Sequence, residues 1–194
     1  MPKTTFYNLS DEKKKRIFDA AVQEFSIRSF SEASLNKIVK SAGIPWGSFY
    51  QYFNDKEDLY LYIIEEIRQE KQKIAPWNPD TDFFATIIQR TKEAFELGRV
   101  KPEYTKIGML MEGDNSEFIT KLRAASAERY KKMIERDKER GLIKPEVDSE
   151  LVINMILRFG LNEYCRNGLD KERYIKKLKD AIKIIKEGIV VIKG

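Results

Sequence analysis

Four aromatic rings, at positions 49, 50, 52 and 53, crowd into the segment SAGIPWGSFYQYFNDK, which runs from residue 41 to residue 56. A helix that buries one face spaces its rings three or four positions apart, so some of these rings are predicted to face outward. A tyrosine hydroxyl can donate to a phosphate oxygen, and Lys56 can add a charged contact. Beside the rings, Gly47 and Ser48 would let another molecule approach the backbone closely. The combination indicates a surface for nucleic acid.

Two short helices must position this segment. Ser34 is predicted to cap the first, which Gly43 ends, and Pro45 opens a second that runs to about Tyr52. Such a pair is typical of a helix-turn-helix, whose second helix lies in the major groove of DNA. The rings at 49 and 53 are then expected to point inward, and those at 50 and 52 outward.

The sequence from Ser29 to Tyr60, and about residues 10–60 in all, resembles the DNA-binding segment of the tetracycline-repressor (TetR) family of transcription regulators. Positions that match the family pattern are Phe30, Ser34, Ile38, Ala42, Gly43, Ile44, Gly47, Ser48, Tyr50, Tyr52, Phe53, Lys56 and Leu59. The resemblance implies that a double-stranded DNA operator is the partner, with some residues on phosphates and others nearest the bases. The phosphate set is Ser48, Tyr50 and Lys56, the base set is Trp46, Gly47, Gln51 and Tyr52, and Ser34 completes the predicted DNA-binding residues.

Two positions depart from the family pattern. Trp46 stands where a small, polar or basic residue is usual, and Ser29 stands where a glycine is common. The indole of Trp46 can only donate a hydrogen bond, so no operator sequence is transferred from the family.

The chain has 194 residues and a net charge of +5. Residues 1–60 contribute 9 basic and 8 acidic side chains, so DNA binding there depends on where charges lie rather than on bulk positive charge. Without histidine and with one cysteine, the chain cannot form an internal disulfide, a Cys/His zinc site or a histidine-dependent triad. We expect no metal and no cofactor.

The periodicity predicts an all-α protein of about nine helices, with no strand pattern and no apolar segment long enough to span a membrane. We expect a helix-turn-helix DNA-binding domain over residues 1–56 and a larger helical domain over residues 57–194, in a cytoplasmic protein without membrane association. The larger domain shows no catalytic constellation and no phosphate loop, which argues against an enzyme.

The TetR resemblance implies that the larger domain binds a small molecule and dimerises. Methionine and aromatic side chains suit an irregular apolar ligand, although such stripes are more often plain core. The predicted ligand-binding residues are Phe84, Ile88, Phe95, Met109, Phe118, Leu122, Tyr130, Met155 and Phe159.

A broad apolar surface on the last helix, together with the helix before it, predicts a four-helix homodimer interface. A deeply buried terminal helix in a monomer is the alternative. The predicted interface residues are Met155, Ile175, Leu178, Ile182, Ile185 and Ile189.

The hypothesis that joins these observations is a homodimeric, ligand-responsive transcriptional repressor, released from an inverted-repeat operator by an apolar small molecule. Its alternatives are a DNA-binding regulator whose larger domain binds a protein partner or no ligand, and a helical enzyme.

Overall fold

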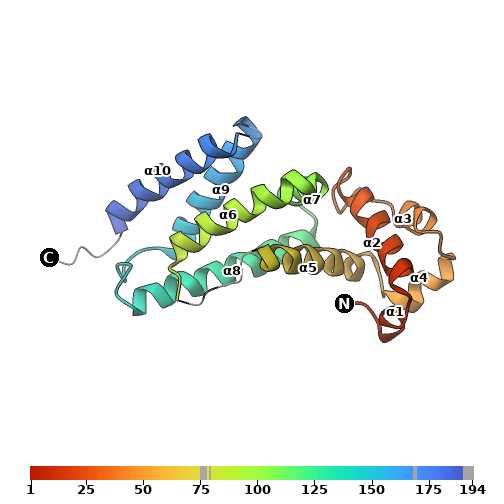
Figure 1. Cartoon of the computed structure of the whole chain (residues 1–194). Coiled ribbons are helices and arrows are strands. Elements are labelled where there is room, and N and C mark those ends of the chain that lie inside the picture. The colour runs from red at the N-terminus through yellow and green to blue at the C-terminus, as the bar shows by residue number, and fades with distance from the viewer. Residues whose placement is uncertain (75–77, 79, 168–169, 190–194) are drawn as a thin grey trace. The chain divides into compact units, whose positions relative to one another are not determined.

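The computed structural model describes residues 1–74, 78, 80–167 and 170–189, without the side chains of residues 161, 162, 164–167 and 189. Over these residues the chain forms ten α-helices and no strand, which confirms the all-α prediction (Figure 1). The helices are α1 Thr4–Tyr7, α2 Asp11–Phe25, α3 Leu35–Ser41, α4 Trp46–Tyr52, α5 Lys56–Ile74, α6 Phe83–Val100, α7 Pro102–Gly113, α8 Glu117–Glu139, α9 Ser149–Asn167 and α10 Lys171–Ile189. The predicted count was about nine, and the helix that the prediction missed is α1.

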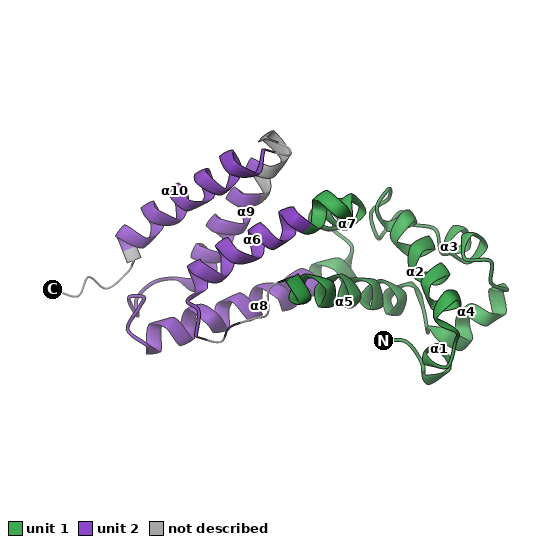
Figure 2. Ribbon diagram, in the orientation of Figure 1, with its two compact units in different colours: residues 1–76, 97–120 green, residues 77–96, 121–194 purple. Residues whose placement is uncertain are grey.

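The chain divides into two compact units (Figure 2). The first contains residues 1–76 and 97–120, and the second contains residues 77–96 and 121–194. The division falls within α6 and α8, so each of these helices contributes to both units. A functional boundary at residue 56 stays a prediction.

Local signals in the first unit place its helices as predicted. The Ser10 hydroxyl accepts a hydrogen bond from the backbone N–H of Lys13 and caps α2, and Asp11 and Glu12 suit the positive end of that helix. Asp55 caps α5 through the N–H of Asp58, at 2.8 Å.

Among the described helices, none is long and apolar enough to cross a membrane.

The second unit is built around one apolar core. α6, α8, α9 and α10 supply its buried side chains, among them Phe83, Ile134, Ile153 and Leu178. The hydroxyl of Tyr174 donates to the carbonyl of Gly160 at 2.8 Å, and a Cβ at position 160 would lie 2.9 Å from that hydroxyl. Gly160 therefore allows α10 to pack closely on α9.

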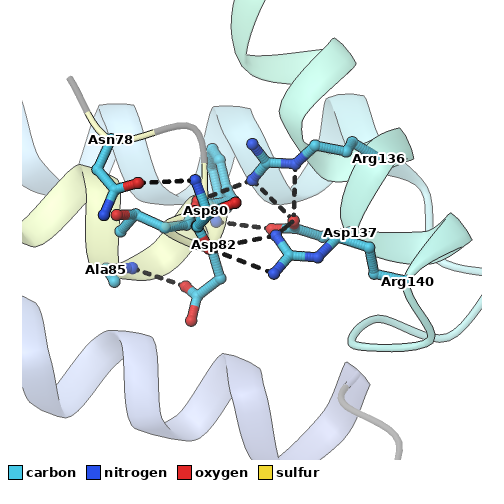
Figure 3. A network of polar contacts seen from close by, with 9 residues as sticks. Asn78, Asp80, Asp82, Ala85, Arg136, Asp137 and Arg140 are labelled. Atoms are coloured by element: carbon cyan, nitrogen blue, oxygen red, sulfur yellow. Dashed lines mark hydrogen bonds and ion pairs between the residues drawn. The ribbon is translucent and has the colours of Figure 1, made fainter.

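A fully buried carboxylate ties α8 to the start of α6 in the second unit (Figure 3). Asp137 Oδ2 accepts from the backbone N–H of Phe83 at 2.6 Å, and Oδ1 accepts from Arg136 at 2.8 Å. Arg136 also donates to the carbonyl of Thr81, and Arg140 donates to the carbonyl of Asp80. The carboxylate thus satisfies a backbone donor at the N-terminus of α6 that has no partner within the helix.

Candidate nucleic-acid interface

The turn between α3 and α4 has the predicted geometry. The Ser34 hydroxyl accepts a hydrogen bond from the N–H of Lys37 and caps α3. Gly43 has a φ of 64°, which only glycine adopts without strain, and Pro45 stands directly before α4. Ala42 and Ile44 are buried on either side of Gly43, so the turn is held from within.

α4 separates its aromatic residues into two faces. Phe49 and Phe53 are buried and stack with ring centroids 5.4 Å apart, as predicted. Trp46 and Tyr50 are each 44% exposed, and their rings meet edge to face at 5.6 Å. Gly47 and Gln51 are also exposed, and Ser48 is half-buried. The helix therefore presents a rigid aromatic pair on its outer side.

Tyr52 does not face outward, and the expectation that its hydroxyl reaches DNA from the outer face is wrong. The side chain is only 6% exposed, and its hydroxyl accepts a hydrogen bond from the amine of Lys13 at 3.1 Å. Positions 49, 52 and 53 are spaced by three and four residues, so all three lie on the inner face of α4. Helical spacing by itself therefore predicts that Tyr52 faces inward.

Lys56 holds a loop of its own unit instead of pointing away from the protein. Its amine donates to the carbonyls of Phe30 and Ala33, at 2.7 and 3.1 Å, and lies over the Phe30 ring. Burial lowers the pKa of the Lys56 amine, and the Asp114 carboxylate opposes that shift. The predicted phosphate contact is thus replaced here by a structural contact, because the loop carbonyls lie within reach of the amine.

Asp114 fastens the same loop from the end of α7. Its carboxylate accepts from the N–H of Ser31 at 2.7 Å and from the N–H of Ser116 at 2.8 Å. Burial by itself would raise the pKa of Asp114, but the hydrogen bonds from Ser116 and Ser31 lower it to about 2. Phe118, which was predicted to bind a ligand, packs its ring 4.6 Å from Phe30 instead. Residues 114–118 therefore anchor the loop that joins α2 to α3.

The N-terminal segment fastens the end of α4, a feature that the sequence analysis missed. The amine of Lys3 donates to the carbonyl of Tyr50 at 2.8 Å, and the N–H of Lys3 donates to the carbonyl of Tyr52 at 2.8 Å. The Thr5 hydroxyl donates to the carbonyl of Gln51. These carbonyls belong to the last turn of α4 and have no partner within the helix. The segment therefore positions α4.

We expect Lys3→Ala to weaken DNA binding about two- to tenfold for all sequences, because one hydrogen bond that positions α4 is lost. The preferred DNA sequence should not change. Hydrogen exchange of the α4 amides should become faster in the variant. Weaker DNA binding without faster exchange of the α4 amides would mean that Lys3 acts only through its charge.

The predicted ligand-binding residues do not form one group. Five of them lie in or against the apolar core of the second unit, namely Phe84, Ile88, Phe95, Tyr130 and Phe159. Leu122 is half-buried. Met109 and Met155 have exposed side chains, which does not fit the expectation that they line an apolar site. Neither periodicity nor composition distinguishes a residue of the apolar core from a residue that lines a ligand-binding site.

The predicted dimer stripe on α10 is largely part of the core of its own unit. Ile175, Leu178 and Ile182 are buried there, and Ile185 packs against them. Their expected role as exposed interface residues is wrong, because α10 uses this face to pack within its own unit. The side chain of Ile189 lies outside the described residues. Some large apolar side chains remain exposed on the described parts of α9 and α10. They are Leu151, Met155 and Leu157 on α9 and Ile184 on α10.

A helix-turn-helix with an exposed aromatic pair on its second helix is typical of a DNA-binding protein. The family model for bacterial regulatory proteins of the tetR family matches residues 17–63. YdgC of Bacillus subtilis, an uncharacterized HTH-type transcriptional regulator, is 27% identical over 75% of this chain and 76% of its own. AcrR of Shigella flexneri, also an HTH-type transcriptional regulator, is 35% identical over 36% of each chain.

The fold comparison extends over the whole chain. A TetR family transcriptional regulator from Chloroflexus aurantiacus has a TM-score of 0.66 and is 26% identical, covering 99% of this chain and 100% of that one. The chain therefore resembles TetR family transcriptional regulators both in its helix-turn-helix and over its whole fold. The proteins that it matches are regulators rather than enzymes.

Proposed function

We propose that this regulator is a repressor that binds an inverted-repeat operator as a homodimer and leaves it when an apolar small molecule binds the larger domain. The observation that carries the DNA part is the outer face of α4. Trp46 and Tyr50 stand exposed there, while the inner face and the last turn of the helix are fastened to the first unit. A rigid helix with exposed aromatic and amide groups suits readout in a major groove.

Selection of bound fragments from genomic DNA tests the proposal directly. A twofold dimer presents two identical helices, so the selected sequences should contain an inverted repeat. Affinity should fall steeply as salt rises, because phosphate contacts release counterions. Equal affinity for selected and random duplexes would contradict sequence-specific binding.

Gly47 offers a test that separates folding from binding. A Cβ at this position would meet no atom within 4 Å, so no contact with the described residues requires glycine in this helix. Gly47→Ala should therefore raise the free energy of unfolding by up to about 1 kcal/mol. It should weaken operator binding, because the added methyl would stand between the α4 backbone and the DNA. Urea denaturation and operator titration measure the two effects.

Gly108 in α7 provides the matched control, since a Cβ there also meets nothing within 4 Å. Gly108→Ala should raise stability to a similar extent and leave operator affinity unchanged. If Gly47→Ala binds the operator as tightly as the wild type, the α4 backbone does not approach DNA closely.

The homodimer is proposed to use the exposed apolar side chains of α9 and α10. Leu151 and Met155 are four residues apart and thus share one side of α9, and Met155 is 50% exposed. Met155→Asp should therefore yield folded monomers that bind the operator weakly. Ile182→Asp should instead unfold the second unit, because Ile182 is buried in its core. Sedimentation and circular dichroism distinguish the two results, and a folded wild-type monomer with full operator affinity would contradict the proposal.

A further inference from the structure

The loop that joins α2 to α3 leads directly into the helix-turn-helix. Its last residue, Ser34, is the N-cap of α3, and the N–H of Ser34 donates to the carboxylate of Glu24 on α2 at 2.9 Å. Only residues 42–45 separate α3 from α4. A displacement of the loop would therefore move the start of α3 and, with it, α4.

Asp114 holds this loop from outside the helix-turn-helix. It follows α7 and lies 83 positions from Ser31 in the sequence, yet its carboxylate accepts from the N–H of Ser31 at 2.7 Å. The Asp114 side chain is only 3% exposed, so water competes little for this hydrogen bond. Asp114 and the loop belong to the same compact unit (Figure 2). The contact is thus part of the internal structure of the first unit.

Lys56 holds the same loop with the opposite charge. Its amine donates to the carbonyls of Phe30 and Ala33, whereas the carboxylate of Asp114 accepts from a backbone N–H. Phe118 packs its ring on Phe30 beside these contacts. Hydrogen bonds to charged groups are about twice as strong as neutral ones. The loop backbone is therefore fixed by a cation and an anion together.

We propose that Asp114 is a positioning residue for operator binding, which acts with Lys56 by fixing the α2–α3 loop and thereby α3 and α4. A carboxylate is repelled by phosphate, so Asp114 acts through the loop and not by touching DNA. Lys56 acts in the same way, through the loop carbonyls instead of a phosphate. The inference rests on the DNA-binding part of the proposed function and needs neither the effector nor the dimer.

Operator titration of Asp114→Ala tests the proposal at a temperature where circular dichroism shows the variant to be fully folded. Affinity should fall about five- to fiftyfold, because a charged hydrogen bond that orders the loop is lost. The selected DNA sequence should not change, and hydrogen exchange of the Ser31 amide and the first turn of α3 should become faster. A variant that melts at a lower temperature but binds the operator as tightly as the wild type would overturn the proposal.

Asp82→Ala is the matched control. The Asp82 carboxylate also accepts from a backbone N–H, that of Ala85 at 2.8 Å, but it does so in the second unit. The substitution removes the same charge and should leave operator affinity unchanged. Equal weakening by Asp82→Ala and Asp114→Ala would show an effect of net charge or general stability and would overturn the positioning role.

Lys56→Ala, alone and combined with Asp114→Ala, tests whether the two residues act on one loop. Lys56→Ala should weaken binding without changing how affinity depends on salt, whereas loss of a phosphate contact would reduce the slope of log affinity against log salt by about 0.9. The double variant should bind more tightly than the product of the two single effects predicts, because both substitutions release the same loop. A reduced slope in Lys56→Ala, or fully additive effects, would overturn the shared role.

The two readouts also separate this inference from the proposed function. If the wild type binds a selected operator and Asp114→Ala binds it equally well, the proposed function stands and the positioning role fails. If the wild type prefers no DNA sequence, the proposed function fails, and faster exchange of the α3 amides in Asp114→Ala would still support the hold of Asp114 on the loop.

Discussion

Asp137→Ala should lower the free energy of unfolding of the second unit by about 3–5 kcal/mol, the usual effect of removing one member of a buried ion pair. The substitution leaves the N–H of Phe83 without its acceptor and the guanidinium of Arg136 without its carboxylate. The start of α6 would keep its cap from Asp82, which accepts from the N–H of Ala85, but would lose its link to α8 (Figure 3). Urea denaturation measures the stability, and hydrogen exchange of the first turn of α6 locates the loss.

Asp80→Ala is the matched control for this prediction. Asp80 lies beside the same network, but Arg140 contacts its backbone carbonyl and not its carboxylate. Removing the Asp80 side chain should therefore change stability by no more than about 0.5 kcal/mol, as at ordinary surface positions. If both variants lose equal stability, the buried carboxylate is not what holds α6 to α8.

Gln51→Ala and Trp46→Ala should each change which base is preferred at one or two operator positions. Both side chains are on the outer side of α4, and a lost base contact costs about 1–3 kcal/mol. That cost corresponds to roughly five- to more than hundredfold weaker binding of the preferred sequence. Repeating the fragment selection with each variant shows the altered preference directly.

Tyr50→Phe is the comparison for these two variants. It removes only a hydroxyl, which is predicted to contact phosphate, so binding to all sequences should weaken about equally. The selected motif should stay the same. If Gln51→Ala leaves both motif and affinity unchanged, α4 is not the helix that reads the bases.

Much of the DNA-binding unit could be predicted because its signals are local. Ser10 and Ser34 cap helices through N–H groups three residues away, and Gly43 and Pro45 mark the turn by their own backbone preferences. The inward positions of Phe49 and Phe53 follow from helical spacing. The inward position of Tyr52 follows from the same spacing, because Tyr52 lies three residues after Phe49, and the prediction that it faces outward was wrong.

The α10 stripe shows the limit of a pattern within one helix. Ile175, Leu178 and Ile182 form an apolar face, and an amphipathic helix is predicted correctly from that spacing. The spacing of apolar residues predicts that one face of a helix is buried. It does not predict which other part of the protein, or which other molecule, that face packs against. Only the tertiary structure shows that this face packs within its own unit, and that Leu151 and Met155 are among the apolar side chains left exposed.

What the sequence by itself determined about this protein is therefore its helices other than α1, the turn between α3 and α4, and its resemblance to the TetR family. Tertiary structure decided the contacts between residues far apart in the chain: Lys3 with Tyr50, 47 positions away, and Asp137 with Phe83, 54 positions away. The physical reason is that caps and helical faces depend on neighbours within about four residues. A buried carboxylate or a lysine amine instead takes whichever backbone group the folded chain brings within hydrogen-bond distance.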